Sequence, residues 1–428
     1  MSKNSEQLAR IPDTKLPRIL IIGGGFGGIY LVQALKGIDA QVVLIDKNNY
    51  YTFQPLLYQV ATSGLESSSI VAPFRKFLGN QKNFFFRLAE VSQVLPEHNI
   101  VETSIGNIKY DYLVISTGAS TNYYGMADIE KHAIPLKNLN DSIQLRNHIL
   151  EKFETALQVG DKEELNSLMD FVVVGGGPTG VEVAGALSEL RTHVFPQDYK
   201  ELDLFHMDIH LIEASPRLLN GMSDEAGNNA LEYLQKMGVE VKLSTGVKSY
   251  DGEVVTLSTG EQIKTKTLVW GAGVKAAPIK GLREEAVLKN NRLKTNAFNQ
   301  VDGYTNIFAL GDVAAVITEE TPNGHAMVAQ PAIQQGENLG YNFKKILKGD
   351  TKLKPFKYFD KGSMATIGRN KAVADIGNFH VGGFIAWVMW LFIHVLFLVG
   401  FKNKIFVLVN WINSYFSYDK SNRLIIRK

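Results

Sequence analysis

Two glycine-rich turns with the same spacing constrain this chain more than any other feature of its sequence. Each lies between a short apolar strand and a helical stretch: Ile19–Ile22, Gly23–Gly28 and Ile29–Leu35, then Phe171–Val174, Gly175–Gly180 and Val181–Leu190. A glycine turn lets the backbone approach a pyrophosphate, and the helix that follows supplies N–H groups and partial positive charge. Each unit therefore predicts a dinucleotide site, with Gly23, Gly25 and Gly28 matched by Gly175, Gly177 and Gly180.

An acid ends the next strand of both units. Asp46 closes Gln41–Asp46, the strand that follows Gly28 and its helix, and Glu213 closes Ile209–Glu213. A carboxylate there accepts the hydroxyls of an adenosine ribose. Glu213 comes later than usual because Thr192–Asp208 lengthens the crossover. An acid at this point repels a 2′-phosphate, so the second unit is expected to prefer NADH over NADPH, a preference that nearby Arg217 would weaken.

The repeat continues beyond the acids, which predicts an internal duplication. Asp111–Gly118 and Thr267–Gly273 are buried strands ending in small residues, and they are offset in the sequence by nearly as much as the two glycine turns are. The fold class expected is α/β, with two Rossmann-like domains. Thr305–Asp312 is a strand that follows the second unit and needs a sheet to join, so the second domain is expected to be inserted into the first. The first domain is expected at 15–125 and 295–335, and the second at 126–294. A connecting hairpin segment at 336–380, which turns at Gly362, Gly368 and Gly377, and C-terminal helices at 381–428 are expected to follow.

Composition narrows the chemistry. The 428 residues include no cysteine, which excludes disulfides, thiolate metal sites, iron–sulfur clusters and a redox dithiol. Redox chemistry must then be carried by a bound cofactor, and no metal site is expected. A net charge of +2 gives no field that would draw in nucleic acid. The polar N-terminal segment, Met1–Arg18, lacks the apolar core of a signal peptide.

The C-terminal part is apolar. Phe384–Phe401 is interrupted only by His394, and Ile405–Phe416 follows after Lys402-Asn403-Lys404. As a helix the first run would cover about 27 Å, just short of the roughly 30 Å hydrocarbon layer. A single span, a pair of helices lying in one leaflet and a buried dimer interface are the alternatives; the in-plane pair is favoured because His394 would be costly inside a span. Aromatic and basic residues suited to a lipid surface are Trp387, Trp390, Trp411, Tyr415, Tyr418, Lys402, Lys404, Lys420, Arg423, Arg427 and Lys428.

Other polar residues are candidates for the chemistry. Glu182 lies in the first turn of the second helix, where it is either an acid stabilised by the helix dipole or a side chain that binds nicotinamide or moves protons. Asp312, at a strand end, either hydrogen-bonds FAD or closes an ordinary turn. Glutamines in Gln54–Gln59 and Ala329–Gln335 either bond a flavin or quinone or serve as helix caps and polar surface.

Six motifs together resemble the type II, non-proton-pumping NADH:quinone oxidoreductases: residues 23–28, 53–62, 173–185, 267–276, 306–314 and 329–336. The resemblance runs from about residue 17 to the C-terminus. It implies noncovalent FAD in the first domain, NADH in the second, monotopic membrane attachment and a homodimer. It also implies a quinone pocket near the isoalloxazine ring and places Glu182 at the flavin–nicotinamide junction. No EF-hand loop is present, so the calcium-regulated branch is not indicated.

The candidate residues follow from the motifs and the resemblance. For FAD they are Gly23, Gly25, Phe26, Gly27, Gly28, Asp46, Lys47, Gln54, Val91, Thr117, Gly118, Asp312 and Gln330. For NADH they are Gly175, Gly177, Pro178, Thr179, Gly180, Glu182, Glu213, Ala272 and Gly273. For quinone they are Gln54, Pro55, Gln330, Ile333, Gln334 and Lys371, and the catalytic candidates are Glu182, Gln330 and Gln334.

The activity implied is oxidation of NADH with two-electron reduction of a membrane quinone, ubiquinone or menaquinone, without proton pumping. The place implied is the bilayer surface at the cytoplasmic face of a bacterial inner membrane. A sulfide:quinone oxidoreductase is excluded because it needs reactive cysteines. A soluble ferredoxin or rubredoxin reductase would not need the apolar tail, and a flavoprotein without turnover is the non-enzyme alternative.

Overall fold

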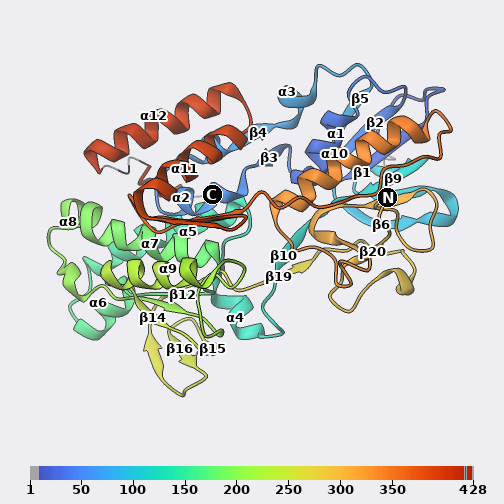
Figure 1. The fold of residues 1–428 in the computed structure, drawn as a ribbon. Helices are drawn as coiled ribbons and strands as arrows, with labels where there is room; N and C mark the ends of the chain where they lie inside the picture. The colour runs from blue at the N-terminus through green and yellow to red at the C-terminus, as the bar shows by residue number, and fades with distance from the viewer. Residues whose placement is uncertain (1–8, 419, 421, 427–428) are drawn as a thin grey trace, which may run out of the picture. The chain divides into compact units, whose positions relative to one another are not determined.

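The computed structural model describes residues 9–418, 420 and 422–426. It forms two compact units, each built from separate stretches of chain (Figure 1). Unit 1 comprises the residues up to Tyr51, Ala72–Ser120 and Val274–Asp360; unit 2 comprises Thr52–Val71, Thr121–Gly273 and the residues from Lys361 onward. The boundaries of the functional domains remain the predictions given above.

Unit 1 is organised on a five-stranded parallel sheet in the order β21-β9-β1-β2-β5. Its strands are β1 (Arg18–Ile22), β2 (Gln41–Asp46), β5 (Phe84–Leu88), β9 (Tyr112–Ile115) and β21 (Ile307–Ala309). β21 pairs with β9, Ile307 opposite Leu113, although the whole second glycine unit lies between these strands in the sequence. The late strand thus returns to the first sheet, which confirms the predicted insertion.

Two helices of unit 1 pack closely because glycines line their contact (Figure 1). They are α1 (Phe26–Ala34) and α10 (Ala329–Ile346). A Cβ on Gly336 would lie 2.6 Å from the Gly27 carbonyl oxygen, and one on Gly340 would lie 2.4 Å from the Ala34 Cβ. α10 thereby continues to Ile346, so the first part of the predicted connecting hairpin segment, 336–346, is helical.

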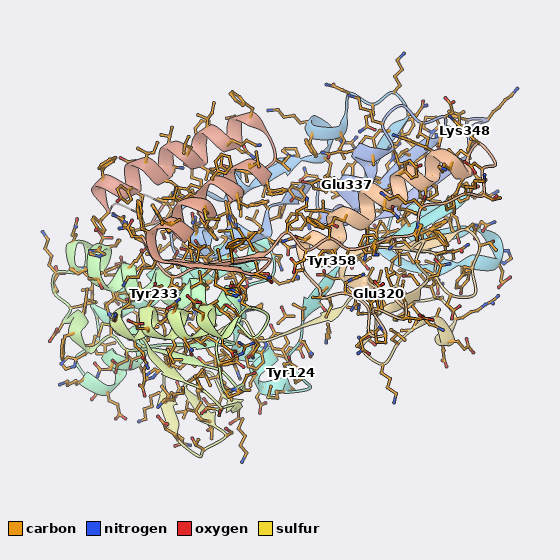
Figure 2. All side chains as sticks on the ribbon, in the orientation of Figure 1. Tyr124, Tyr233, Glu320, Glu337, Lys348 and Tyr358 are labelled. Atoms are coloured by element: carbon orange, nitrogen blue, oxygen red, sulfur yellow. The ribbon has the colours of Figure 1, made fainter. Side chains whose placement is uncertain are left out.

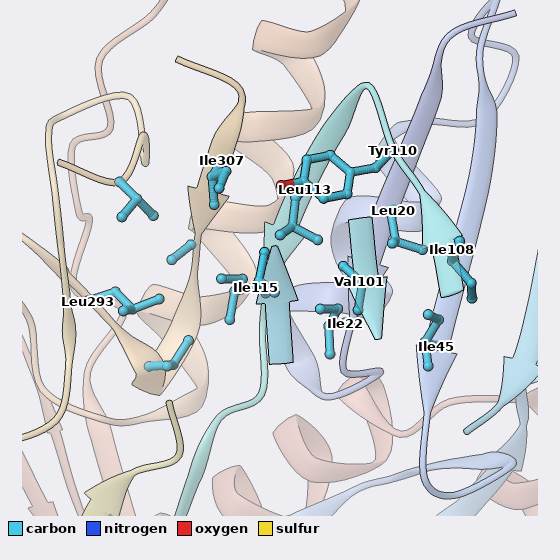
Figure 3. Close-up of a cluster of buried hydrophobic side chains, with 14 of the residues drawn as sticks. Leu20, Ile22, Ile45, Val101, Ile108, Tyr110, Leu113, Ile115, Leu293 and Ile307 are labelled. Atoms are coloured by element: carbon cyan, nitrogen blue, oxygen red, sulfur yellow. The ribbon is translucent and has the colours of Figure 1, made fainter. Parts of the chain in front are cut away.

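The core of unit 1 lies between this sheet and a smaller antiparallel one (Figure 3). Leu20, Ile45 and Ile115 of the parallel sheet pack with Val101 and Ile108 of the smaller sheet, and all are at most 2% exposed. The other elements of unit 1 and its borders are β3 (Tyr50–Thr52), β4 (Val71–Pro73), α3 (Phe74–Leu78), β6 (Val91–Leu95), β7 (Ile100–Thr103), β8 (Gly106–Lys109), β10 (Ala119–Thr121), β19 (Val274–Ala276), β20 (Leu293–Thr295) and β22 (Ala314–Val316).

Unit 2 repeats the plan with a second parallel sheet in the order β11-β18-β12-β13-β14. Its strands are β11 (Ile134–Pro135), β12 (Phe171–Val174), β13 (Ile209–Ile212), β14 (Glu240–Lys242) and β18 (Thr267–Trp270). The other elements of this part are α2 (Leu57–Ala61), α4 (Ala127–His132), α5 (Leu139–Ala156), α6 (Lys162–Met169), α7 (Pro178–Glu189), the π-helical segment η4 (Leu190–Val194), α8 (Phe195–Asp198), α9 (Asp224–Lys236), β15 (Val247–Tyr250), β16 (Val254–Leu257) and β17 (Gln262–Lys264). The matching strand orders confirm the two Rossmann-like halves.

A C-terminal part of unit 2 begins with an antiparallel sheet. β23 (Ser363–Thr366), β24 (Ala372–Ile376) and β25 (Phe379–Gly382) pair in sequence order. Gly362, Gly368 and Gly377 all have positive φ, at 96°, 66° and 57°. The antiparallel segment and its three turn glycines are therefore as predicted.

The apolar part after this sheet forms a pair of helices, as expected, and the break between them lies inside the run Phe384–Phe401. α11 (Gly383–Phe397) ends before Leu398, whose ψ of 135° is extended, and α12 (Phe401–Ser417) follows Gly400 at φ 89°. Within the described residues, no helix has the length and hydropathy needed to cross a bilayer.

His394 faces the protein, which explains its place in an apolar run. Its ring stacks on Trp390 with centroids 3.9 Å apart and meets the Phe53 ring edge-on at 6.1 Å. Burial lowers the pKa of His394 to about 4, so it is neutral at pH 7.

Apolar stripes are exposed on both helices. Residues four apart on α11, from Phe384 to Leu396, and a matching row on α12, from Phe401 to Phe416, are all at least 45% exposed. The exposed apolar face, as we call it below, comprises Phe384, Val388, Phe392, Leu396, Phe401, Ile405, Leu408, Ile412 and Phe416.

The basic residues expected at a lipid surface are partly engaged elsewhere. Lys420 pairs with Glu189 and Arg423 with Asp198 inside unit 2, so the expectation that they meet head groups is corrected. Lys404 donates to the Leu396 carbonyl and caps α11. Arg427 and Lys428 lie outside the described residues.

Candidate functional site

The first glycine turn forms a cradle in which each glycine has its own role. Gly23 has φ 98°, and an added Cβ would lie 2.3 Å from the Ser116 carbonyl oxygen. A Cβ on Gly28 would lie 2.0 Å from the Gly23 carbonyl oxygen, so this glycine lets helix and strand pack. A Cβ on Gly25 meets no protein atom within 4 Å, and Gly25 is the N-cap of α1 without a capping side chain. An anionic ligand can therefore approach the helix end at Gly25.

Asp46 lies beside this cradle, as its position in the sequence predicts. Its two carboxylate oxygens accept hydrogen bonds from the Gly24 and Asn48 N–H groups, each at 2.7 Å. Burial raises the pKa of Asp46, and the two N–H groups and Lys47 partly offset that rise. The carboxylate thus closes the glycine turn at the end of β2.

Three more residues expected at FAD, Thr117, Gly118 and Asp312, follow the carboxyl ends of β9 and β21 in unit 1. Gly118 has φ 72°, and an added Cβ would meet nothing. Thr117 donates to the Ala277 carbonyl at 2.6 Å. Asp312 lies in a single 3-10 turn, Gly311–Val313, directly after β21. The buried Gln335 accepts a hydrogen bond from the Gly311 N–H at 2.7 Å and so fixes this turn.

Three members of the expected FAD set, Lys47, Val91 and Gln54, have other settings. Lys47 is exposed, and Val91 begins β6 and packs at the border of the core of unit 1. Gln54 and Pro55 belong to unit 2, in a 3-10 turn of residues 54–56. Gln54 is exposed there.

The second glycine turn repeats the geometry of the first. Gly175 has φ 109°, and a Cβ on Gly180 would lie 1.8 Å from the Gly175 carbonyl oxygen. Gly177 is the N-cap of α7, and a Cβ there meets no protein atom within 4 Å. Pro178 and Thr179 begin the helix, where proline loses no hydrogen bond. Gly273 ends the neighbouring loop after Ala272 with φ 79°.

Glu213 holds this second turn as Asp46 holds the first. Its carboxylate accepts hydrogen bonds from the Gly176 N–H at 2.5 Å and the Ser215 N–H at 2.7 Å. Arg217 bonds Asp224 and donates to the Asn220 carbonyl at 2.9 Å. The guanidinium that would weaken a preference for NADH therefore already has an acidic partner.

Glu182 is 8% exposed on α7. Burial raises its pKa well above the usual range, and the Thr366 backbone N–H and the Trp390 indole partly offset this. The indole N–H of Trp390 is buried and makes no hydrogen bond of ordinary geometry. Burial thus favours the protonated form of this carboxyl, and a protonated carboxyl can donate a proton.

A cavity of about 100 Å³ lies beside Glu182 within unit 2. We call it the carboxylate cavity. A hydrogen-bonded row forms part of its wall: the Trp411 indole donates to Gln59 at 2.7 Å, and the Gln59 amide donates to the Tyr58 hydroxyl at 2.9 Å. Its charged lining residues are Glu182, Glu189, Arg369 and Lys420.

The expected quinone residues have different surroundings. Gln334 is tied to Phe359, donating to its carbonyl at 2.8 Å and accepting from its N–H at 3.0 Å. Its amide thus has a structural partner, whereas Gln330 lies in the first turn of α10 and Ile333 is buried one turn further on. Lys371 lies over the ring of Tyr233, labelled in Figure 2, at 5.5 Å. It does not line the carboxylate cavity.

Comparison with known proteins identifies the family. The model described as pyridine nucleotide-disulphide oxidoreductase matches residues 17–336, and the NDH2 C-terminal domain matches residues 361–417. The type II NADH:quinone oxidoreductase Ndh of Mycobacterium tuberculosis is 36% identical over 97% of this chain and 91% of its own length. This chain belongs to the type II NADH:quinone oxidoreductase family. The resemblance drawn from the motifs is thereby confirmed.

Other members and solved structures agree. The type II NADH:quinone oxidoreductase of Staphylococcus aureus is 30% identical over 86% of this chain and 91% of its own length. NDH2 from Plasmodium falciparum, solved in complex with NADH, gives a TM-score of 0.89 at 20% identity over 96% of this chain and 100% of that one. The sulfide:quinone oxidoreductase of Aquifex aeolicus gives 0.71 at 18% identity over 96% of both chains. Because these two solved structures share only 20% and 18% sequence identity with this chain, the similarity shows a common fold alone.

The sequence analysis of this type II NADH:quinone oxidoreductase did not predict which polar residues share the carboxylate cavity. It named Gln59 only as a candidate flavin or quinone ligand and Lys420 only as a residue suited to a lipid surface, and it did not single out Arg369. Tyr58, Gln59, Arg369 and Lys420 reach one cavity from separate segments. No local spacing links these segments, so only the fold could bring them together. Gln335 is different, because it directly follows Gln334 in a motif that the sequence analysis had already singled out.

Proposed function

We propose that this chain binds FAD noncovalently in unit 1 and NADH in unit 2, and passes two electrons from NADH to a membrane quinone without pumping protons. The observation that carries the proposal is the pair of matching glycine cradles, each open at its helix N-cap and closed by a strand-terminal acid. Membership of the type II NADH:quinone oxidoreductase family supports the assignment of the two nucleotides.

The residues of unit 1 fit FAD. Gly25 leaves room for a pyrophosphate at the uncapped end of α1, and Asp46 lies where the ribose hydroxyls would be. When bound, the flavin would accept a hydride and return two electrons. Thr117, Gly118 and Asp312 would border it at the carboxyl end of the sheet, which is where ligands bind in open α/β folds.

The chain's own residues would then bind, orient and supply protons. Glu213 would select NADH, and Glu182 would hold a proton close to the reaction because burial disfavours its ionised form. Each of Gln330, Ile333, Gln54 and Pro55 is proposed as a quinone-binding residue. We assign Gln334 and Lys371 a smaller role in quinone binding, because Gln334 is hydrogen-bonded to Phe359 and Lys371 lies over the ring of Tyr233.

The exposed apolar face supports peripheral attachment to a bilayer through α11 and α12. An apolar face of this kind is favourable only when it is covered. We propose that lipid covers it, at the cytoplasmic face of a bacterial membrane, and that the enzyme works there as a homodimer.

The reaction is tested on the detergent-solubilised chain under anaerobic conditions. NADH should bleach a flavin spectrum, and a short-tail quinone, ubiquinone or menaquinone type, should restore it. A bleached flavin that quinone fails to reoxidise would overturn the proposal. A retained flavin that NADH leaves oxidised would identify a flavoprotein without this turnover.

The attachment is tested with Phe392→Asp and Phe416→Asp, which alter side chains that are 69% and 79% exposed. Binding to anionic phospholipid vesicles should be lost while folding is kept. Phe205→Asp is the control, since Phe205 is 88% exposed on a different segment of unit 2. Equal vesicle binding by all three variants would refute attachment through this face.

A further inference from the structure

A charged pair in the carboxylate cavity has no role in the reaction described so far. Glu189 and Lys420 line this cavity, with a carboxylate oxygen 3.3 Å from the ammonium nitrogen. Lys420 is 9% exposed, and its ammonium group also donates to the Ala186 carbonyl at 3.4 Å. Removing two charges from water is costly, so a buried pair is weak evidence for stability. Stability alone therefore does not account for this pair.

Helix α7 aligns this pair with Glu182. Glu182, Ala186 and Glu189 follow the i, i+4, i+7 spacing of one helical face, and all three line the cavity. At 1.5 Å per residue, the two acids lie about 10 Å apart along the axis. The π-helical segment η4 begins directly after Glu189, and such wide turns often occur at functional sites.

The cavity between the two acids suits water. Its volume of about 100 Å³ holds a few molecules at roughly 30 Å³ each. Hydrogen-bonded oxygens are about 2.8 Å apart, so about three waters would bridge 10 Å. Tyr58, Gln59 and Thr366 supply polar groups along the wall. The outer end is the wetter one, because the Glu189 side chain is 21% exposed, whereas Glu182 is 8% exposed.

We propose that Glu189 and Lys420 form the outer end of a proton relay that runs through waters in the carboxylate cavity to Glu182. This inference rests on the proposed function. NADH, a quinone and one solvent proton give NAD⁺ and the quinol, with both electrons coming from NADH. The solvent proton reaches Glu189 and Lys420, passes along the waters and re-forms the Glu182 O–H bond. That bond breaks each time Glu182 supplies the proton of a new quinol O–H.

The charged surroundings of the pair fit a group that exchanges protons. Burial lowers the pKa of Lys420 and Arg369 adds to this, whereas Glu189 raises it. Burial lowers the pKa of His193 too, with Glu189 opposing and Arg369 and Lys420 adding to the effect. Burial raises the pKa of Tyr58, and both Glu182 and Glu189 add to the rise. Lys420 thus releases its proton more readily than an exposed lysine.

The test compares Glu189→Gln and Lys420→Met with the wild-type chain in detergent. NADH should reduce the flavin of both variants at the wild-type rate. Reoxidation by a short-tail quinone should be about 10-fold slower, with a larger solvent isotope effect and the steepest loss at high pH. Lys420→Arg keeps the charge, but a guanidinium does not release its proton, so this variant should slow reoxidation as Lys420→Met does.

Arg423→Met is the matched control. Arg423 pairs with Asp198 at 2.6 Å, so it fastens the same C-terminal segment, but it does not line the carboxylate cavity. It should reoxidise normally. An equal slowing in Arg423→Met would assign the effect to loss of the segment's attachment and overturn the relay.

Two further results would also overturn it. One is an unchanged reoxidation rate and isotope effect in both relay variants. The other is a raised quinone KM with unchanged kcat, which would make the cavity a quinone site. Failure of the wild-type chain to reduce quinone would instead refute the proposed function, so the two failures are distinguishable.

Discussion

The two nucleotide-binding halves have nearly the same cradle but different crossovers. In both, one glycine packs helix on strand, one leaves the helix end open, and an acid fastens the turn. Between β1 and β2 the chain makes only α1. Between β12 and β13 it makes α7, η4, α8 and a 3-10 turn, Leu204–His206, and this longer crossover carries Glu182 and Glu189. The glycine cradle, which the two halves share, is thus the feature suited to nucleotide binding. We infer that proton transfer depends on the longer crossover, which is where the two halves differ.

The packing glycines should give the largest effect, and an equal one in both halves. In Gly28→Ala and Gly180→Ala the new Cβ would lie 2.0 Å and 1.8 Å from a backbone oxygen. Because backbone cannot move aside easily, we expect each variant to lose about 4 kcal/mol or more of unfolding free energy. Urea denaturation measures this. If only one of the two variants lost unfolding free energy, the two cradles would not be structurally equivalent.

The open glycines should separate the halves by ligand. The new Cβ of Gly25→Ala or Gly177→Ala meets no protein atom within 4 Å, and both φ values, −71° and −74°, suit alanine. Stability should therefore be kept. Gly25→Ala should lose flavin, and Gly177→Ala should keep flavin but bind NADH about 10-fold or more weakly, about 1.4 kcal/mol. The visible absorbance of bound oxidised flavin and an NADH titration report this. Unchanged affinities in both variants would contradict the cradle model.

The two acids should differ in specificity. Glu213→Gln removes the charge that repels a 2′-phosphate, so the preference for NADH over NADPH should narrow about 10-fold. Asp46→Asn, its counterpart in unit 1, should weaken flavin retention and leave this preference unchanged. The ratio of kcat/KM for the two nucleotides is the measurement. An unchanged ratio in Glu213→Gln would show that Glu213 does not determine the preference for NADH over NADPH.

The smallest effect concerns stability against pH. Burial raises the pKa of Glu182 above its usual 4.5, so the stability contribution of the neutral form is fully present below about pH 4.5 and is lost as pH rises through the raised pKa. The free energy of unfolding of Glu182→Gln should equal that of the wild type at low pH and exceed it at higher pH. Each kcal/mol of difference should raise Tm by about 2–4 °C. A constant difference in Tm from pH 4 to pH 9 would show that Glu182 is not the titrating group.

Local patterns predicted the cradles well because neighbouring residues decide them. Gly23 has positive φ, and there is no room for a side chain at Gly28. The Asp46 carboxylate, at the end of β2, accepts a hydrogen bond from the Gly24 N–H in the turn that follows the neighbouring strand β1. The same reasoning failed for Lys420 and Arg423. They looked like lipid-facing cations in a basic tail, yet their acidic partners lie far earlier in the chain, at the end of α7 and the end of α8.

The sequence by itself determined the two parallel sheets, the insertion of one half into the other, the two nucleotide cradles and the family. Strand–turn–helix spacing and side-chain size are local properties, so they can be read without a fold. Only the tertiary structure decided that the apolar run breaks at Gly400, that His394 turns inward, and that Glu182, Tyr58 and Lys420 share one cavity. The physical reason is that burial and charge pairing depend on segments that the chain brings together only when it folds.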